Sequence, residues 1–158
     1  MDALITQLLA VVDQAYNRRS WHGTNLRGAV RGVTPEAAVR RPAPGRHNIQ
    51  ELVVHAAYWK YAAWRRLTGS QRGSFALAGS NFFARDRADA VQWRSDVALL
   101  DRMHADLRGA IAATPRSRLT ARLGAAGGPV TVQGLITGIA AHDLYHAGQI
   151  QLIKTLAK

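Results

Sequence analysis

Two histidines one helical turn apart are the residues of this sequence best suited to chemistry. His142 and His146 lie in the segment HDLYH, and side chains four residues apart share one face of an α-helix. Two imidazoles placed in this way can bind one metal ion at about 2.0–2.1 Å each. A third histidine, His55, lies in a separate apolar stretch. We therefore predict a site for one divalent metal ion with His55, His142 and His146 as ligands.

The apolar pattern around these histidines predicts that they face a helical core. Between residues 132 and 156, apolar residues spaced three and four apart form a stripe, which His142 and His146 interrupt. His55 interrupts a similar stripe between residues 49 and 67. Burying an imidazole without a partner costs free energy. A metal ion would give all three imidazoles a common partner, because neutral imidazole is its commonest ligand.

Helical periodicity covers most of the chain, so we expect an all-α fold, a four-helix bundle with long connecting loops. Asn48 and Glu51 form a capping box at the start of the second helix, and Gly69 follows its end. Connections this long suit a bundle in which at least one link crosses over. Residues 1–158 are expected to form a single domain. The helices are expected at about 2–18, 49–67, 88–113 and 132–156, with a short helix at 35–40 capped by Thr34 and a small hairpin closed at 127–129.

Composition excludes several other kinds of site. The chain has no cysteine, which rules out disulfides, iron–sulfur clusters and cysteine-bound zinc. Its two glutamates, Glu36 and Glu51, are too few for a dinuclear carboxylate bundle. HDLYH also lacks the glutamate that serves as the base in HExxH metalloproteases.

Three imidazoles leave positions on the ion open, as in catalytic sites. They suit zinc, nickel, iron(II) or cobalt, and the bound ion would activate a water or an external thiol.

Four further residues are candidates for the pocket or for contacts with the ligands. Gln149, one turn after His146, is expected to hydrogen-bond a metal-bound water or to satisfy a neighbouring helix. Asp143 is expected to orient a ligand imidazole or to form a salt bridge with an arginine. Trp59 is expected either to form a wall of the pocket or to belong to the apolar core, where aromatic residues at helical spacing more often lie. His22 lies in a glycine-flanked loop; a place in the pocket lining, with this loop folded over the metal, is the less favoured reading, and a position outside the lining is the alternative.

Two other side chains have expected positions. His104 lies on the apolar stripe of the third helix, so we expect a core histidine with a structural partner, and a place in the same cavity is the alternative. Tyr145 is expected to face away from the metal, because it is offset around the helix from both neighbouring histidines.

The formal charge of +11 raises the possibility of nucleic-acid binding, but the pattern of charges does not favour it. Arginine supplies 18 of the 21 basic residues, and no long basic run occurs. The N-terminal segment lacks the features of a signal peptide, and no apolar run approaches the ~20 residues of a membrane span. We expect a cytoplasmic protein with a small-molecule substrate, and neither a membrane nor nucleic acid as partner.

Two segments resemble the signatures of the DinB-like family, also called the YfiT-like metal-dependent hydrolases. They are NIQELVVHAAYWKYAAWRRLTG (48–69) and VQGLITGIAAHDLYHAGQIQLIK (132–154). The pattern H-D-x-Y-H-x-G-Q-I, with an upstream histidine after E-L-V-V, is specific evidence for a resemblance to this family. The resemblance extends over essentially the whole chain and includes WHGTNLRGAVRGVTPEAAVRRPAPG (21–45).

The resemblance implies an up-down-down-up bundle, often dimeric, in which His55, His142 and His146 bind one divalent ion. Nickel or zinc is expected, with iron, cobalt or manganese as alternatives. Characterised relatives include low-molecular-weight thiol transferases and a mycothiol-dependent maleylpyruvate isomerase. We therefore expect a homodimeric metal-dependent enzyme, either a hydrolase or a transferase that uses an external low-molecular-weight thiol. The alternative is a non-catalytic metal- or ligand-binding protein of the stress response.

Overall fold

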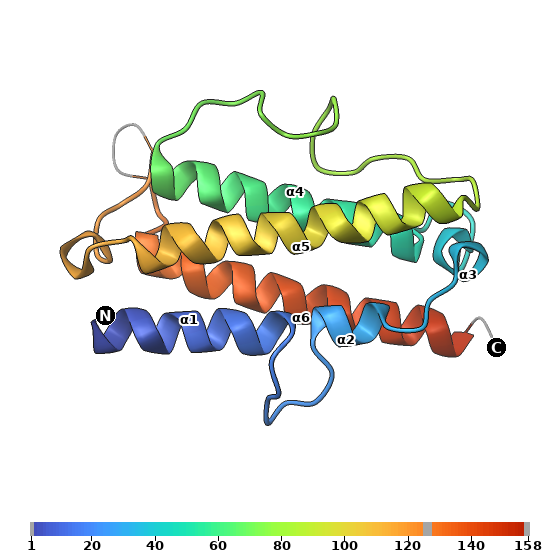
Figure 1. The fold of residues 1–158 in the computed structure, drawn as a ribbon, viewed down its shortest axis with the longest axis horizontal. Coiled ribbons are helices and arrows are strands. Elements are labelled where there is room, and N and C mark those ends of the chain that lie inside the picture. Colours follow the sequence, from blue (N-terminus) through green and yellow to red (C-terminus); the bar gives the residue numbers. More distant parts are fainter. Residues whose placement is uncertain (1, 125–127, 157–158) are drawn as a thin grey trace.

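A computed structural model describes residues 2–124 and 128–156 of the chain, and this part is helical without any strand (Figure 1). The expected all-α fold class is confirmed. None of the described helices combines the length and apolarity that crossing a membrane requires. The elements are α1 (Ala3–Tyr16), α2 (Leu26–Val30), α3 (Pro35–Val39), α4 (Ile49–Thr68), α5 (Ala90–Ala112), the 3-10 helix η1 (Arg116–Arg118) and α6 (Val132–Leu156).

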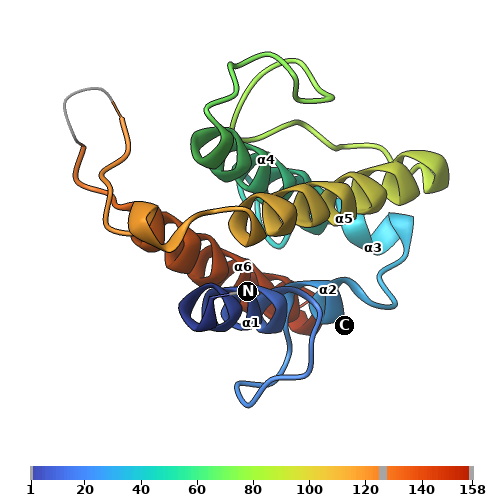
Figure 2. The ribbon, with the colours of Figure 1, turned by 60° about the vertical axis from the view of Figure 1, so that its left-hand side comes forward.

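The four long helices form two pairs that run in opposite directions. Figure 1 shows α1 and α6 running from left to right, and α4 and α5 from right to left. The order along the chain is therefore up, down, down, up. α4 packs against α5 and α6, and α1 packs against the same two helices. Figure 2 shows α4 and α5 lying above α6 and α1.

Because α4 and α5 run in the same direction, residues 69–89 must lead from one end of the bundle back to the other. Figure 1 shows this green-to-yellow segment passing above α4. This segment is a crossover, which the long connecting segments of the sequence predict. The segment passes beside the middle of α4, where it contributes residues to the candidate site.

Local signals place α4 where the sequence predicts it. The Asn48 side chain accepts a hydrogen bond from the backbone N–H of Glu51 at 2.8 Å, which caps the first turn. Gly69 has φ +77° and ends the helix in the left-handed conformation that glycine adopts without strain. These two ends fix the register of α4. They therefore fix the position along the helix axis from which the His55 side chain projects.

Two short features differ from the prediction or extend it. The helix α2 is not predicted, since five residues including Gly28 carry too little periodicity; its N-cap is Asn25, and it packs against α6. An antiparallel bridge joins Arg122 and Thr131, as a small hairpin requires. Gly127, at the predicted hairpin tip, lies outside the described residues.

The buried face of α6 is rotated slightly from the predicted stripe. Val132, Ile136, Asp143 and Ile150 are its most buried residues, and the last three of them are spaced by seven. Leu156, which the stripe placed in the core, is exposed, and His142 is only half-buried. The physical reason is that α6 is covered by α1, α2 and α4 together, so their combined contact, and not the strict three–four spacing, defines its inner face. The predicted ligands on α6 consequently lie at the edge of the core.

Candidate metal centre

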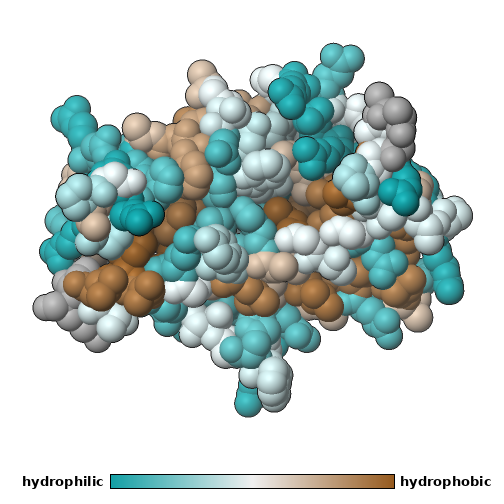
Figure 3. Space-filling model, turned by 180° about the vertical axis from the view of Figure 1, so that it is seen from behind, coloured by the Kyte–Doolittle hydropathy of each residue, from teal (hydrophilic) through white to brown (hydrophobic). Residues whose placement is uncertain are grey.

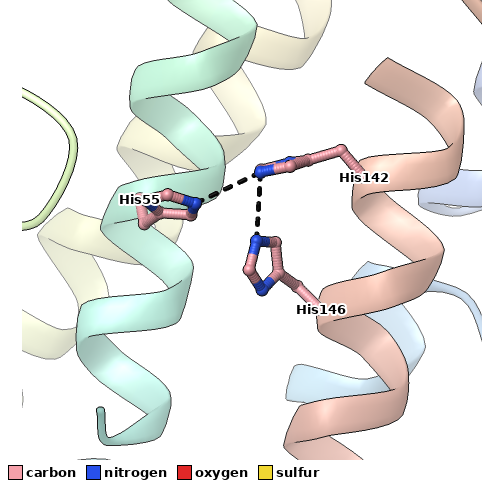
Figure 4. Close-up of side chains that lie close together, drawn as sticks. All are labelled: His55, His142 and His146. Carbon is pink, nitrogen blue, oxygen red and sulfur yellow. Dashed lines mark hydrogen bonds between the residues drawn. The ribbon is translucent and has the colours of Figure 1, made fainter. Parts of the chain in front are cut away.

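Three imidazoles meet between α4 and α6. His55 projects from α4, and His142 and His146 project from successive turns of α6 (Figure 4). The Nε2 atom of His142 lies 3.1 Å from Nε2 of His55 and 3.0 Å from Nε2 of His146. We call these three residues the histidine cluster. The structure thus brings together all three residues that the sequence predicts as ligands.

The spacing of the nitrogens fits a divalent metal ion. Imidazole nitrogens bind zinc at about 2.0–2.1 Å, so two of them in a tetrahedral shell lie about 3.3 Å apart. The two observed separations, 3.0 and 3.1 Å, are close to this value. One nitrogen from each ring lies within 4.8 Å of the others. Small side-chain adjustments would therefore let the three rings surround one ion.

Hydrogen bonds on the far side of two rings set their tautomers. Nδ1 of His55 lies 2.9 Å from the backbone oxygen of Asn81, and Nδ1 of His146 lies 2.6 Å from Oε1 of Gln149. Because both oxygens are acceptors, each Nδ1 carries the hydrogen and each Nε2 presents a lone pair. His142 can donate a proton to only one of these lone pairs. A cation among the three rings would satisfy all of them at once.

Burial keeps these imidazoles in the neutral form that binds metals. It lowers the pKa of His142 to about 3, and the neighbouring His146 and His55 add to the effect. Burial also lowers the pKa of His146 to about 4, and it lowers the pKa of His55. At neutral pH the histidine cluster is therefore uncharged, so that it offers lone pairs without protons that would compete with a metal ion.

The histidine cluster opens into a cavity of about 850 Å³. Three lining residues of α6, Tyr145, Leu152 and Leu156, are 64%, 59% and 65% exposed, so the cavity is open to solvent. Hydrophobic surface gathers near the C-terminal end of α6 on the side seen in Figure 3. The cavity thus combines a polar inner end with an apolar wall. This combination suits a small molecule with an apolar part.

Two of the four residues considered for the pocket line the cavity. Trp59 lines the cavity, and its Nε1 donates a hydrogen bond to Oδ1 of Asn81 at 3.0 Å. Gln149 also lines the cavity. Its oxygen accepts from His146, which differs from both roles that the sequence suggested, a bond to a metal-bound water and a bond to a neighbouring helix. Tyr145 does not face away, because it lines the cavity and its ring lies 5.1 Å from that of His146.

Asp143 has a partner that the sequence pattern does not indicate. It is fully buried and bonds to Lys60 of α4, whose side chain is also fully buried. Neither expected partner, an arginine or a ligand imidazole, bonds to it among the described residues. The reason is the rotation of α6, which directs Asp143 into the α4–α6 interface.

His22 and His104 both lie outside the cavity lining. His22 is exposed in the loop between α1 and α2, where its Nδ1 is 3.4 Å from the Ser20 hydroxyl. The loop projects away from α4 in Figure 1, so of the two readings of His22 the structure shows the position outside the cavity lining. His104 is buried in α5, where its ring stacks on Tyr16 at 3.8 Å. It is therefore a core histidine, as expected, and not part of the cavity.

Three residues of the cavity lining escape sequence reasoning. Asn81 and Phe82 come from the crossover between α4 and α5, which carries no periodicity that could place it against α4. Asn81 has φ +66°, a conformation that asparagine tolerates better than most residues. His47, just before α4, also lines the cavity. A signal for it exists, since it stands four residues before Glu51.

Comparison with known proteins supports the family suggested by these residues. A family model described as the DinB superfamily matches residues 18–150. The match covers most of the chain and includes the whole histidine cluster. A search of curated proteins found no match.

Proposed function

The chain belongs to the DinB superfamily, and from this and the histidine cluster we propose that it is a divalent-metal-dependent enzyme with a small-molecule substrate. One observation carries the proposal, which is the convergence of three imidazole nitrogens at the inner end of an open cavity. A purely structural metal site has its coordination shell closed by protein ligands. Here the chain would supply three ligands, and the three nitrogens that would hold the ion border an open cavity.

The proposed reaction is hydrolysis, or transfer involving an external low-molecular-weight thiol. An ion bound by three neutral ligands keeps its full charge and would lower the pKa of a water molecule toward about 7, or that of a thiol. Zinc or nickel is the proposed ion, and iron(II), cobalt and manganese also accept imidazole ligands. The chain has no cysteine, so any thiol must come from outside.

The residues of the chain have distinct proposed roles. His55, His142 and His146 hold the ion. Asn81 and Gln149 accept hydrogen bonds from two of these rings and so fix the direction of their lone pairs. The apolar wall that includes Leu152 and Leu156 would bind the apolar part of the substrate.

Cobalt(II) substitution tests whether the ion is held with open positions. We expect the visible spectrum of the cobalt-loaded protein to change when azide or 2-mercaptoethanol is added, because each would enter the coordination shell from the cavity. Hydrolysis of p-nitrophenyl acetate, and coupling of 2-mercaptoethanol to 1-chloro-2,4-dinitrobenzene, then assign the reaction class. A cobalt spectrum that responds to neither ligand would contradict a catalytic site.

A further inference from the structure

His47 occupies a position in the cavity wall next to the histidine cluster. Its ring stacks on Phe82 with the centroids 3.6 Å apart and the planes inclined by 4°. The opposite neighbour of Phe82 is the ligand His55, at 4.0 Å and 11°. A single aromatic ring therefore separates His47 from the histidine cluster, and all three rings border the same cavity.

A buried carboxylate holds the His47 ring in a defined orientation. Nδ1 of His47 lies 2.8 Å from Oε2 of Glu51, whose side chain is only 5% exposed. Arg41 donates to both oxygens of the same carboxylate, at 2.6 and 3.1 Å. Burial would raise the pKa of Glu51, but the hydrogen bonds from Arg41 and His47 hold it below its usual value. Glu51 is therefore an ionised acceptor, and Nδ1 of His47 carries the hydrogen.

This arrangement leaves Nε2 of His47 unprotonated, so that this nitrogen has a lone pair that can accept a proton. The described residues provide no hydrogen-bond partner for it. None of the described residues lining the cavity is an aspartate or a glutamate. Outside the histidine cluster, His47 is accordingly the one described lining residue with an imidazole side chain, the side chain that most often transfers protons in catalysis.

We propose that His47 is the proton-transfer residue of this cavity and that Glu51 is its positioning residue, an inference that rests on the proposed function. Nε2 of His47 takes the proton from the O–H of water or the S–H of an external thiol as the water oxygen or the thiol sulfur attacks the substrate. A new N–H bond forms, and Glu51 stabilises the resulting imidazolium. The same proton then passes to the leaving group, which restores the neutral ring.

Proton counting during ligand binding tests this role without requiring turnover. Acetohydroxamic acid binds metal sites as its anion and gives up a proton. Calorimetry of the zinc-loaded protein in buffers of different ionisation enthalpy measures how many protons reach the buffer. We expect His47→Asn to release more protons than the wild type, by up to one per site, because the asparagine amide can still donate to Glu51 but cannot accept the proton. His22→Asn, at an exposed histidine outside the cavity, should match the wild type.

Equal proton release by the wild type and His47→Asn would overturn the role of His47 and leave the proposed metal site intact. A zinc-loaded wild type that does not bind acetohydroxamic acid would overturn the open site itself, and the inference with it. The two failures are therefore distinguishable.

Nitrogen NMR of the zinc-loaded protein tests the positioning role of Glu51 independently. We expect His47 to be the Nδ1–H tautomer in the wild type, and the Nε2–H population to rise in Glu51→Gln, because the neutral amide can also donate to Nδ1. A predominant Nε2–H tautomer in the wild type would overturn the proposal. So would a tautomer population that Glu51→Gln leaves unchanged in a folded protein.

Discussion

The orientation of a ligand imidazole depends on the acceptor behind it. The oxygen of Gln149 lies 2.6 Å from Nδ1 of His146, and the backbone oxygen of Asn81 is placed in the same way behind His55. Each acceptor makes the opposite nitrogen of the ring a better ligand. His142 has no such acceptor among the described residues, so its direction depends on packing and on the other two rings.

Replacing Gln149 should therefore weaken metal binding without removing a ligand. We expect Gln149→Leu to lower zinc affinity about 10–100-fold, whereas Gln149→Glu retains an acceptor and remains close to the wild type. Competition with a chromophoric chelator measures both. Gln151→Leu is the matched control, because Gln151 is exposed two residues further along α6. Zinc affinity unchanged by Gln149→Leu would show that this hydrogen bond does not matter.

For individual residues, the sequence predicts which histidines form the cluster but not what surrounds them. His55, His142 and His146 are recognisable because each interrupts an apolar helical stripe. The position of Asn81 depends on the path of an irregular segment over α4, and irregular segments carry no periodic signal. The contact of Phe82 with both His47 and His55 is likewise a product of tertiary folding.

The relative placement of α4 and α6 decides whether the histidine cluster forms at all. Lys60 and Asp143 form an ion pair across this interface, with side chains 0% and 1% exposed. Asp143 directly follows His142 in the chain, so the pair lies close to the site. Lys60 also lies 4.7 Å from the centre of the Tyr16 ring, which connects α4 to α1.

Removing one member of this buried pair should be much more damaging than removing both. We expect Lys60→Met to cost about 3–5 kcal/mol in the free energy of unfolding, since it leaves a buried carboxylate unpaired. The double variant Lys60→Met/Asp143→Leu should recover most of that loss. Urea unfolding measures each. For comparison, Arg108→Ala, which breaks a partly exposed pair with Asp13, should cost about 1 kcal/mol or less. A Lys60→Met cost as small as that would contradict the account of the interface.

The sequence places the four long helices well and the short ones less reliably. α6 begins and ends where its pattern does, and α4 has clear caps at both ends. α5 begins two residues later than expected, because Asp89 caps it through the backbone N–H groups of Val91 and Gln92. α2 depends on its packing against α6, since a five-residue helix is not stable by itself.

Four histidines are buried or half-buried, and this makes the stability of the fold sensitive to acid. They are His55, His104, His142 and His146. Burial, reinforced by the charges of Lys60 and Arg108, lowers the pKa of His104 to about 3. The unfolded chain binds this proton near the ordinary value of 6.5. Between these two values acid favours the unfolded state, so the stability contributed by the neutral ring is present above pH 6.5 and declines below it.

Replacing His104 should therefore flatten the acid side of the stability curve. We expect His104→Phe, which can still stack on Tyr16, to reduce the dependence of the unfolding free energy on pH by about 1.4 kcal/mol per pH unit between about pH 6 and pH 4. Urea unfolding at several pH values checks this. If the unfolding free energies of the wild type and the variant depended on pH with the same slope, this would contradict a neutral, buried His104.

The homodimer implied by the family resemblance remains a prediction.

Metal analysis of His142→Ala tests whether the histidine cluster holds a metal ion, because the Nε2 atom of His142 lies within 3.1 Å of the Nε2 atoms of both other histidines. We predict one divalent ion per chain for the wild type and for His22→Ala after loading and removal of excess metal. His142→Ala should lose most of that metal while it keeps its helical circular dichroism spectrum. A folded His142→Ala that retains one ion per chain, or a wild type that retains none, would rule out the histidine cluster as the metal site.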